Sequence, residues 1–182
     1  DAVASLYERN SLNEIIKETS KNIFIPITVG GGIRSIDDAN KILRSGADKI
    51  AINTAAIKNP RLIEELSNRF GSSTIVLSIE AKQTLNGSWE AYTNNGREKT
   101  GIDVIKWSLE AEKLGAGEIL LTSVDKEGTG RGVDNDLIKS VTDNITVPVI
   151  ASGGMGNFQH FADVVQLSEC DGVAIANLLH YS

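Results

Sequence analysis

The stretch Ile25-Pro26-Ile27-Thr28-Val29-Gly30-Gly31-Gly32 returns later in the chain as Val147-Pro148-Val149-Ile150-Ala151-Ser152-Gly153-Gly154. Each copy is followed by a second related stretch, Ala47-Asp48-Lys49-Ile50-Ala51-Ile52-Asn53 in the first half and Cys170-Asp171-Gly172-Val173-Ala174-Ile175-Ala176 in the second. The two pairs have offsets of 122 and 123 residues. This agreement indicates an internal repeat, and each copy holds four strand and helix units.

Short apolar runs alternate with amphipathic stretches of helical length along the chain. The expected strands are Ile25 to Val29, Lys49 to Ile52, Thr74 to Ile79, Glu118 to Thr122, Val147 to Ala151 and Gly172 to Ala176. The expected helices are Leu12 to Thr19, Ile36 to Ser45, Pro60 to Phe70, Val104 to Leu114, Asp136 to Thr142 and Phe158 to Ser168. Continuously apolar strands joined by helices indicate a parallel sheet that is buried on both sides. An open doubly wound sheet also fits this pattern, but the repeat favours a (β/α)8 barrel.

A complete (β/α)8 barrel has about 250 residues, whereas this sequence has 182. Counting back along the repeat places Asp1 at the end of the second strand and the last residue just after the eighth. We therefore expect residues 1–182 to belong to a single barrel domain without its N-terminal unit and its last helix. The polar stretch from Gln83 to Lys99, with Asn-Gly pairs at both ends, predicts a β-hairpin inserted after the Thr74 strand.

The composition excludes several classes of protein. The 18 Lys and Arg residues against 24 Asp and Glu give a net charge of −6, which argues against a nucleic-acid binder. The longest apolar runs fall far short of the roughly 20 residues that cross a membrane. Cys170 has no partner for a disulfide, so a reducing cytoplasm is expected. His160 and His180 lack metal-ligand spacing, and we expect no metal site.

Two glycine-rich or polar turns recur at the carboxyl ends of expected strands, where barrel enzymes build their active sites. The first half supplies Gly31 and Gly32 with Asn53 and Thr54, and the second supplies Ser152, Gly153 and Gly154 with Asn177. Backbone amides in such turns can approach an anion closely. We predict one phosphate cradle in each half, and hence an elongated substrate with two phosphates. The alternative is that these glycines serve only the geometry of tight turns.

Four carboxylates also fall at the carboxyl ends of strands: Asp1, Glu80, Asp125 and Glu127. Glu80 ends a strand of an otherwise apolar barrel, which predicts a raised pKa and a role as general acid or base. The alternative is an ion pair between Glu80 and Lys82. For Asp125 and Glu127, substrate positioning and capping of the polar loop that follows Thr122 are both open.

Lys49 and Glu118 begin their strands and so belong to the N-terminal face of the barrel. That face usually concerns stability or contacts rather than chemistry. A structural salt bridge is the simplest interpretation of this pair.

A set of longer motifs points to one known family. The motifs are Asp1-Ala2-Val3-Ala4-Ser5, Thr28-Val29-Gly30-Gly31-Gly32-Ile33, Gly46-Ala47-Asp48-Lys49, Ile52-Asn53-Thr54-Ala55-Ala56, Gly115-Ala116-Gly117-Glu118-Ile119-Leu120-Leu121-Thr122-Ser123 and Ala151-Ser152-Gly153-Gly154. With them the sequence resembles the cyclase subunit of imidazole glycerol phosphate synthase, the HisF family, over essentially the whole chain. A related isomerase shares the repeat and both phosphate sites, but the Asn53 to Ala56 and Gly117 to Ser123 runs resemble the cyclase.

The resemblance implies a (β/α)8 lyase of histidine biosynthesis that needs no cofactor. Such a protein takes ammonia from a glutaminase subunit, HisH-type, docked on the N-terminal face of the barrel. It converts a doubly phosphorylated ribulosyl aminoimidazole nucleotide to imidazole glycerol phosphate and aminoimidazole carboxamide ribotide.

The resemblance also implies a role for each matching residue. One phosphate would be held by Gly31, Gly32, Asn53 and Thr54, and the other by Gly128, Ser152, Gly153, Gly154 and Asn177. Glu80 would be catalytic, with Asp1, Thr122, Asp125 and Glu127 positioning the substrate. Lys49 and Glu118 match part of a charged ring at the ammonia entrance, and Asp48 matches a contact to the glutaminase.

Three positions depart from the family pattern. Glu80 and Glu127 stand where the family has aspartate, and Asn177 stands where it often has a small residue. The change to glutamate keeps the charge and moves the carboxylate by about one methylene, and a misplacement of about 1 Å can cost on the order of a hundredfold in rate. Besides the lyase, two functions stay open: delivery of ammonia for amidation of a surface-polysaccharide sugar, and a scaffold that only activates the glutaminase.

Overall fold

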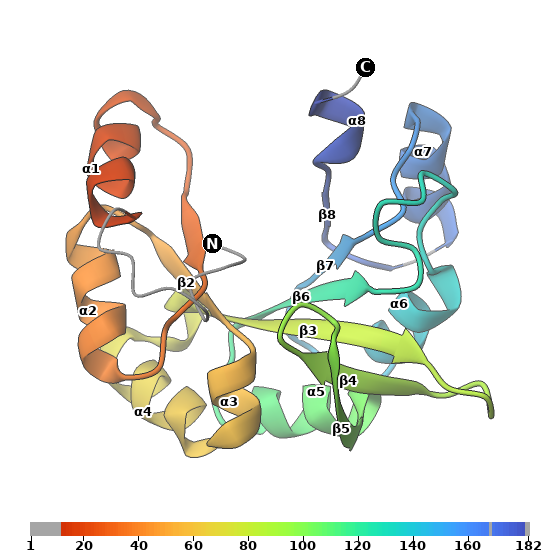
Figure 1. Cartoon of the computed structure of the whole chain (residues 1–182), viewed down its shortest axis with the longest axis horizontal. Coiled ribbons are helices and arrows are strands. Elements are labelled where there is room, and N and C mark those ends of the chain that lie inside the picture. Colours follow the sequence, from red (N-terminus) through yellow and green to blue (C-terminus); the bar gives the residue numbers. More distant parts are fainter. Residues whose placement is uncertain (1–11, 168, 181–182) are drawn as a thin grey trace.

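Six parallel strands form a curved sheet in the computed structural model, which describes residues 12–167 and 169–180. In spatial order they are β1 (Thr28–Gly30), β2 (Lys49–Ile52), β3 (Ile75–Gln83), β6 (Glu118–Ser123), β7 (Val149–Ser152) and β8 (Gly172–Ala174). The sheet curls into an arc, and helices follow its outer side (Figure 1). This curled parallel sheet with alternating helices confirms the fold class of the (β/α)8 barrel.

The helices agree closely with the sequence pattern. They are α1 (Leu12–Asn22), α2 (Ile36–Arg44), α3 (Thr54–Lys58), α4 (Arg61–Phe70), α5 (Val104–Lys113), α6 (Asn135–Thr142), α7 (Phe158–Leu167) and α8 (Asn177–His180), with a 3₁₀ turn η1 (Ser72–Thr74) before β3. Ser35 is the N-cap of α2, because its Oγ accepts the backbone N–H of Asp38 at 3.2 Å. The short helices α3 and α8 were not among the expected elements.

The internal repeat is visible in the hydrogen bonding of the backbone. The carboxylate of Asp48 accepts the N–H of Ile27 at 2.8 Å, and that of Asp171 accepts the N–H of Val149 at 2.9 Å. In return, the N–H of each aspartate donates to the carbonyl of the same partner residue. The two halves therefore place the same side chain at the start of equivalent strand pairs.

Two strands begin later than the apolar pattern predicts. The pattern placed their starts at Ile25 and Val147, whereas β1 begins at Thr28 and β7 at Val149. Pro26 and Pro148 lack the N–H that a sheet needs from a strand residue, and an aspartate carboxylate takes the N–H that follows each proline. The runs before Thr28 and Val149 therefore lead into the strands without belonging to them.

The hydrophobic core lies between the sheet and the helices. Alternate residues of the strands point outward into this layer and are completely or almost completely buried, among them Ile50, Leu77, Ile79, Ile119 and Leu121. The indole of Trp107 on α5 is buried against them. The intervening residues of the same strands therefore point to the inner side of the curved sheet.

The expected insertion is present and longer than predicted. Strand β3 continues to Gln83 and pairs with β4 (Trp89–Thr93), which pairs in turn with β5 (Glu98–Asp103), both antiparallel. The connections contain Gly87, Asn94, Asn95 and Gly96, all with positive φ. We call the segment from Gln83 to Asp103 the hairpin.

None of the helices in the described ranges is both long enough and apolar enough to cross a membrane.

Candidate active site

Glu80 lies in a row of polar side chains that crosses three neighbouring strands. In the parallel registers, Glu80 of β3 is opposite Thr122 of β6, and Thr122 is opposite Ser152 of β7. Paired residues of a sheet point to the same face, and adjacent strands lie about 4.8 Å apart. The row therefore brings Glu80, Thr122 and Ser152 together on the inner side of the sheet, near the carboxyl ends of the strands.

The carboxylate of Glu80 is half-buried and hydrogen-bonded. Its Oε2 accepts the N–H of Gly96 at 2.8 Å. The side chain of Asn53 and the N–H of Asn95 also donate to the carboxylate. Burial raises the pKa of Glu80, and these three hydrogen bonds oppose the rise without cancelling it. The suggested ion pair with Lys82 does not form, since the Lys82 ammonium lies over the ring of Tyr92, 5.7 Å from its centre.

Glu80 lines the larger of two cavities described at this edge of the sheet, and its volume is about 780 Å³. Gly31, Gly32, Asn53 and Thr54 line it, so the structure brings together all four residues of the first expected cradle. Gly31 and Gly32 have φ values of 105° and 70°. The amide of Asn53 also donates to the carbonyl of Tyr92 at 3.2 Å, which ties this cradle to the hairpin.

Two cations and two asparagines of the same cavity escaped the sequence analysis: Arg34, Lys58, Asn94 and Asn95. Arg34 lies two residues after Gly32, and its N–H donates to the carboxylate of Asp38 at 3.1 Å. Lys58 ends α3, one helical turn beyond Thr54. The place of Lys58 could have been predicted from the sequence, because it lies one helical turn after Thr54 of the expected cradle. The place of Asn94 and Asn95 could not, because it depends on how the hairpin folds back toward the cavity.

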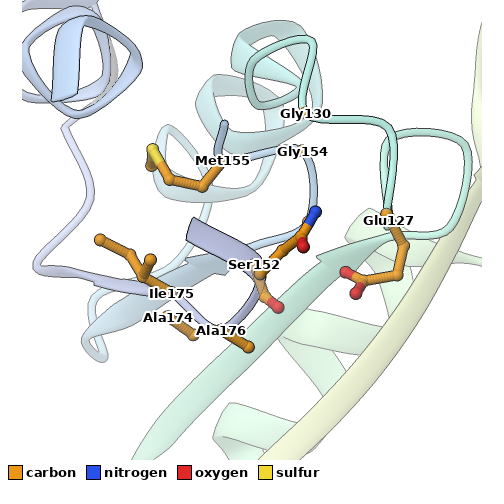
Figure 2. Close-up of a pocket in the computed structure, with 11 residues that line it drawn as sticks. Glu127, Gly130, Ser152, Gly154, Met155, Ala174, Ile175 and Ala176 are labelled. Carbon is orange, nitrogen blue, oxygen red and sulfur yellow. The ribbon is translucent and has the colours of Figure 1, made fainter. Parts of the chain in front are cut away.

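The smaller cavity, of about 130 Å³, lies at the ends of β7 and β8. Its walls include all five residues of the second expected cradle: Gly128, Ser152, Gly153, Gly154 and Asn177. Glu127 also lines it, and Figure 2 shows its carboxylate directed toward Ser152, with Ala174, Ile175 and Ala176 on the other side of the pocket. This pocket therefore offers backbone groups, one hydroxyl, one amide and one carboxylate.

The glycines of the smaller cavity also serve the packing of two loops. Gly154 has a φ of 93°, and a Cβ atom there would lie 2.1 Å from the carbonyl oxygen of Gly132. A Cβ on Gly156 would lie 2.2 Å from the carbonyl oxygen of Gly130. The N–H of Gly132 donates to the carbonyl of Gly154 at 2.8 Å. Close contact between the loops after β6 and β7 is therefore sufficient reason for glycine at 154 and 156.

The structure separates the two carboxylates of the loop after β6. The carboxylate of Asp125 accepts the N–H of Gln83 at 2.7 Å and so fastens the loop to the end of β3. The carboxylate of Glu127 instead faces the smaller cavity. This geometry gives Asp125 a capping contact and leaves the Glu127 carboxylate facing the smaller cavity. Asp1 lies outside the described residues.

At the opposite ends of the strands, Lys49 of β2 and Glu118 of β6 form an ion pair across β3. Their side chains are 30% and 12% exposed, so the pair is largely shielded from solvent. Asp48 is exposed, and its carboxylate is occupied by the N–H of Ile27. The expected salt bridge between Lys49 and Glu118 is therefore confirmed.

His, Cys, Asp and Glu side chains form no group of three that could hold a metal ion within residues 12–167 and 169–180. Cys170 is partly buried two residues before β8, and burial raises the pKa of its thiol. The two cavities are lined by carboxylates, hydroxyls and amides, and the larger one also by the cations Arg34 and Lys58.

Fold and site together define a protein of the (β/α)8-barrel class, with two glycine-lined pockets at the carboxyl ends of the strands and one carboxylate in the wall of each. The chain belongs to the histidine biosynthesis protein family, whose sequence profile matches residues 1–182. It is 63% identical over 161 residues to the imidazole glycerol phosphate synthase subunit HisF of Legionella pneumophila, a match that covers 88% of this chain and 76% of that protein. The chain is thus a homologue of HisF, and the resemblance drawn from its motifs is confirmed.

Proposed function

We propose that this chain is the cyclase subunit of an imidazole glycerol phosphate synthase. It would use ammonia to convert a doubly phosphorylated ribulosyl aminoimidazole nucleotide to imidazole glycerol phosphate and aminoimidazole carboxamide ribotide. The observation that carries the proposal is the polar row that links Glu80, in the wall of the larger pocket, through Thr122 to Ser152 in the wall of the smaller one. Each of these pockets also has a glycine-rich turn. A substrate with a phosphate at each end fits this arrangement, because both ends would be fixed while its centre faces one carboxylate.

The two pockets suggest different ways of holding the two phosphates. In the larger one, Arg34 and Lys58 add positive charge to the turn of Gly31 and Gly32. In the smaller one, Ser152 and Asn177 can donate hydrogen bonds beside the backbone of Gly128, Gly153 and Gly154. The carboxylate of Glu127 in this pocket would repel a phosphate and accept hydroxyl groups, so we assign it to a sugar hydroxyl.

Glu80 is the candidate for proton transfer. Its raised pKa brings the carboxyl nearer to the pH at which it can both accept and donate a proton. Thr122, its neighbour in the polar row, can orient the reacting part of the substrate through its hydroxyl. Removing a general acid or base typically costs about a hundredfold to ten-thousandfold in rate.

The partner in this proposal is a glutaminase subunit on the N-terminal face of the barrel. Lys49 and Glu118 pair on that side of the sheet, where ammonia would enter. Asp48 is exposed next to Lys49 and could contact the partner. Ammonia that enters there would travel along the inner side of the sheet to Glu80.

The test is steady-state turnover of the ribulosyl bisphosphate substrate with an ammonium salt, for the native protein and the variants Glu80→Asp and Glu80→Gln. We expect turnover by the native protein and a loss of at least about a hundredfold in Glu80→Gln. Turnover that appears only in Glu80→Asp would contradict the proposal and favour ammonia delivery for sugar amidation. A third outcome would favour the scaffold. In that case no variant turns over the substrate, and Glu80→Gln activates the glutaminase as well as the native protein does.

A further inference from the structure

The turn between β4 and β5 presents its backbone to the carboxylate of Glu80. Asn94, Asn95 and Gly96 have φ values of 53°, 60° and 71°, so three consecutive residues adopt the left-handed conformation. Asparagine and glycine are the residues that adopt it at least cost. As a result, the N–H groups of Asn95 and Gly96 both reach Glu80, the latter at 2.8 Å from Oε2.

The turn is held from two sides. The N–H of Asn94 lies 3.4 Å from the Oγ1 of Thr54, which lines the larger cavity. On the other side, Gly96 packs on Val124, because a Cβ atom at Gly96 would lie 3.0 Å from both γ-carbons of that valine. The turn therefore lies between the expected phosphate cradle of the first half and the loop that follows β6.

We propose that the Asn94-Asn95-Gly96 turn is a positioning element, whose two N–H groups fix the direction of the Glu80 carboxylate. This inference rests on the proposed function, in which Glu80 transfers the proton. The longer glutamate side chain has one more rotatable bond than aspartate. Two donors from a turn that is itself anchored restrict that freedom and hold the carboxylate at the wall of the larger cavity.

Few other groups can set the ionisation of Glu80. Lys82 lies on the same strand and faces Tyr92 of β4, and Arg34 and Lys58 line the same cavity. Among the described residues, the groups that shift the pKa of Glu80 are instead the donors of the turn and of Asn53. The balance is therefore between burial, which raises this pKa, and those donors, which lower it.

The experiment compares Asn95→Val with Asn95→Gly in the full chain. Valine strongly disfavours a positive φ, whereas glycine accepts it and removes only the side chain. The readout is the titration of the Glu80 carboxyl carbon by NMR in protein with ¹³C-labelled glutamate, assigned with Glu80→Gln. We expect Asn95→Val to raise the pKa of Glu80 by about one unit, since a hydrogen bond to the charged form is lost, and Asn95→Gly to leave it near the native value.

An unchanged pKa in Asn95→Val, or an equal rise in both variants, would overturn the inference. Circular dichroism establishes that each variant is folded. If Asn95→Val does not fold, the pair Gly96→Ala with and without Val124→Ala replaces it. We then expect the pKa to rise in Gly96→Ala and to stay raised in the double variant, since the positive φ and not the contact with Val124 is decisive. An unchanged pKa in both variants contradicts the inference, whereas a native pKa in the double variant alone would still support it and assign the effect of Gly96→Ala to the contact with Val124.

The titration needs no substrate, so it is independent of the proposed reaction. Where turnover is present, the acidic limb of the pH profile of kcat is expected to move with the titration of Glu80 in the same variants. Absence of turnover in the native protein would count against the proposed function only. A pKa of Glu80 that is the same in the native protein and in the turn variants would count against the positioning role only.

Discussion

The indole Nε1–H of Trp89 donates to the Oδ2 of Asp134 at 3.2 Å and joins the hairpin to the start of α6. The same carboxylate accepts the hydroxyl of Ser123 at 3.3 Å and the N–H of Leu137 at 3.1 Å, the latter as the N-cap of the helix. One side chain thus connects β4, the end of β6 and α6. The hairpin that carries the turn at Glu80 is fastened to the helical layer through this contact.

Replacing Asp134 with alanine should loosen all three elements. We expect a loss of about 1–3 kcal/mol in the free energy of unfolding, from the lost cap and the unpaired indole N–H. The emission of Trp89 should shift to the red, and subtraction of the Trp89→Phe spectrum removes the contribution of Trp107. Asp134→Asn is the matched control, because asparagine also caps helices and accepts a hydrogen bond. Equal stability of the alanine variant and the native protein would contradict this account.

Glycine at 154 should be harder to replace than another glycine of similar backbone conformation. Gly71 has a φ of 87° with nothing within 4 Å of the place a Cβ would take, whereas Gly154 has a φ of 93° and a carbonyl oxygen at 2.1 Å from that place. We expect Gly71→Ala to cost about 1 kcal/mol from its φ alone, and Gly154→Ala to cost about 3 kcal/mol or more. Urea unfolding of both variants measures the difference. Similar costs would mean that the two loops can separate freely.

The charge of Lys58 should contribute to binding in the larger cavity. In Lys58→Gln we expect KM for the bisphosphate substrate to rise about tenfold with little change in kcat, as for one charge-assisted hydrogen bond to a phosphate. Lys106→Gln on α5 provides a control of the same charge change outside the cavity. A fall in kcat at unchanged KM would place Lys58 in the chemical step instead.

Two carboxylates should affect stability with opposite dependence on pH. The pKa of Glu80 is raised by burial, so its contribution to stability is greatest below the unfolded pKa and is lost as the pH rises through the folded value. The pKa of Glu112 is lowered, chiefly by the Thr146 hydroxyl, so its contribution is present above the unfolded pKa and is lost as the pH falls.

Urea unfolding between pH 4 and pH 8 separates these two effects. We expect Glu80→Gln to gain stability relative to the native protein as the pH rises, and Glu112→Gln to lose it over the acidic part of that range. Because the hydrogen bonds between Glu112 and Thr146 are exposed to solvent, the effect of Glu112 should be the smaller of the two. The same sign for both variants would contradict the assigned environments.

The ion pair of Lys49 and Glu118 can be measured by a double-mutant cycle. With both side chains largely shielded, we expect a coupling energy of about 1–2 kcal/mol between Lys49→Met and Glu118→Leu. If the pair also lies on the path of ammonia, each variant should reduce glutamine-dependent turnover more than ammonium-driven turnover. Equal reduction of both activities would confine the pair to a structural role.

Much of this molecule could be predicted from its sequence. The repeat of Ile25 to Gly32 in Val147 to Gly154 led to the barrel, and the apolar alternation located the strands to within a few residues. Both expected cradles line real cavities, because residues at the carboxyl ends of parallel strands must meet at one edge of the sheet. Less local features were missed: the extension of β3 to Gln83, and the late starts of β1 and β7 after Pro26 and Pro148.

By itself, the sequence determined the class of fold, the family and the set of residues at the mouth of the barrel. Those properties follow from local periodicity, from the repeat and from the chemistry of single side chains. Only the tertiary structure decided which partner each group takes: Glu80 the hairpin turn instead of Lys82, Asp125 the end of β3, and Asp134 the indole of Trp89. The physical reason is that these partners lie 16 to 45 residues apart, and their meeting depends on strand register and on the direction in which the hairpin folds back.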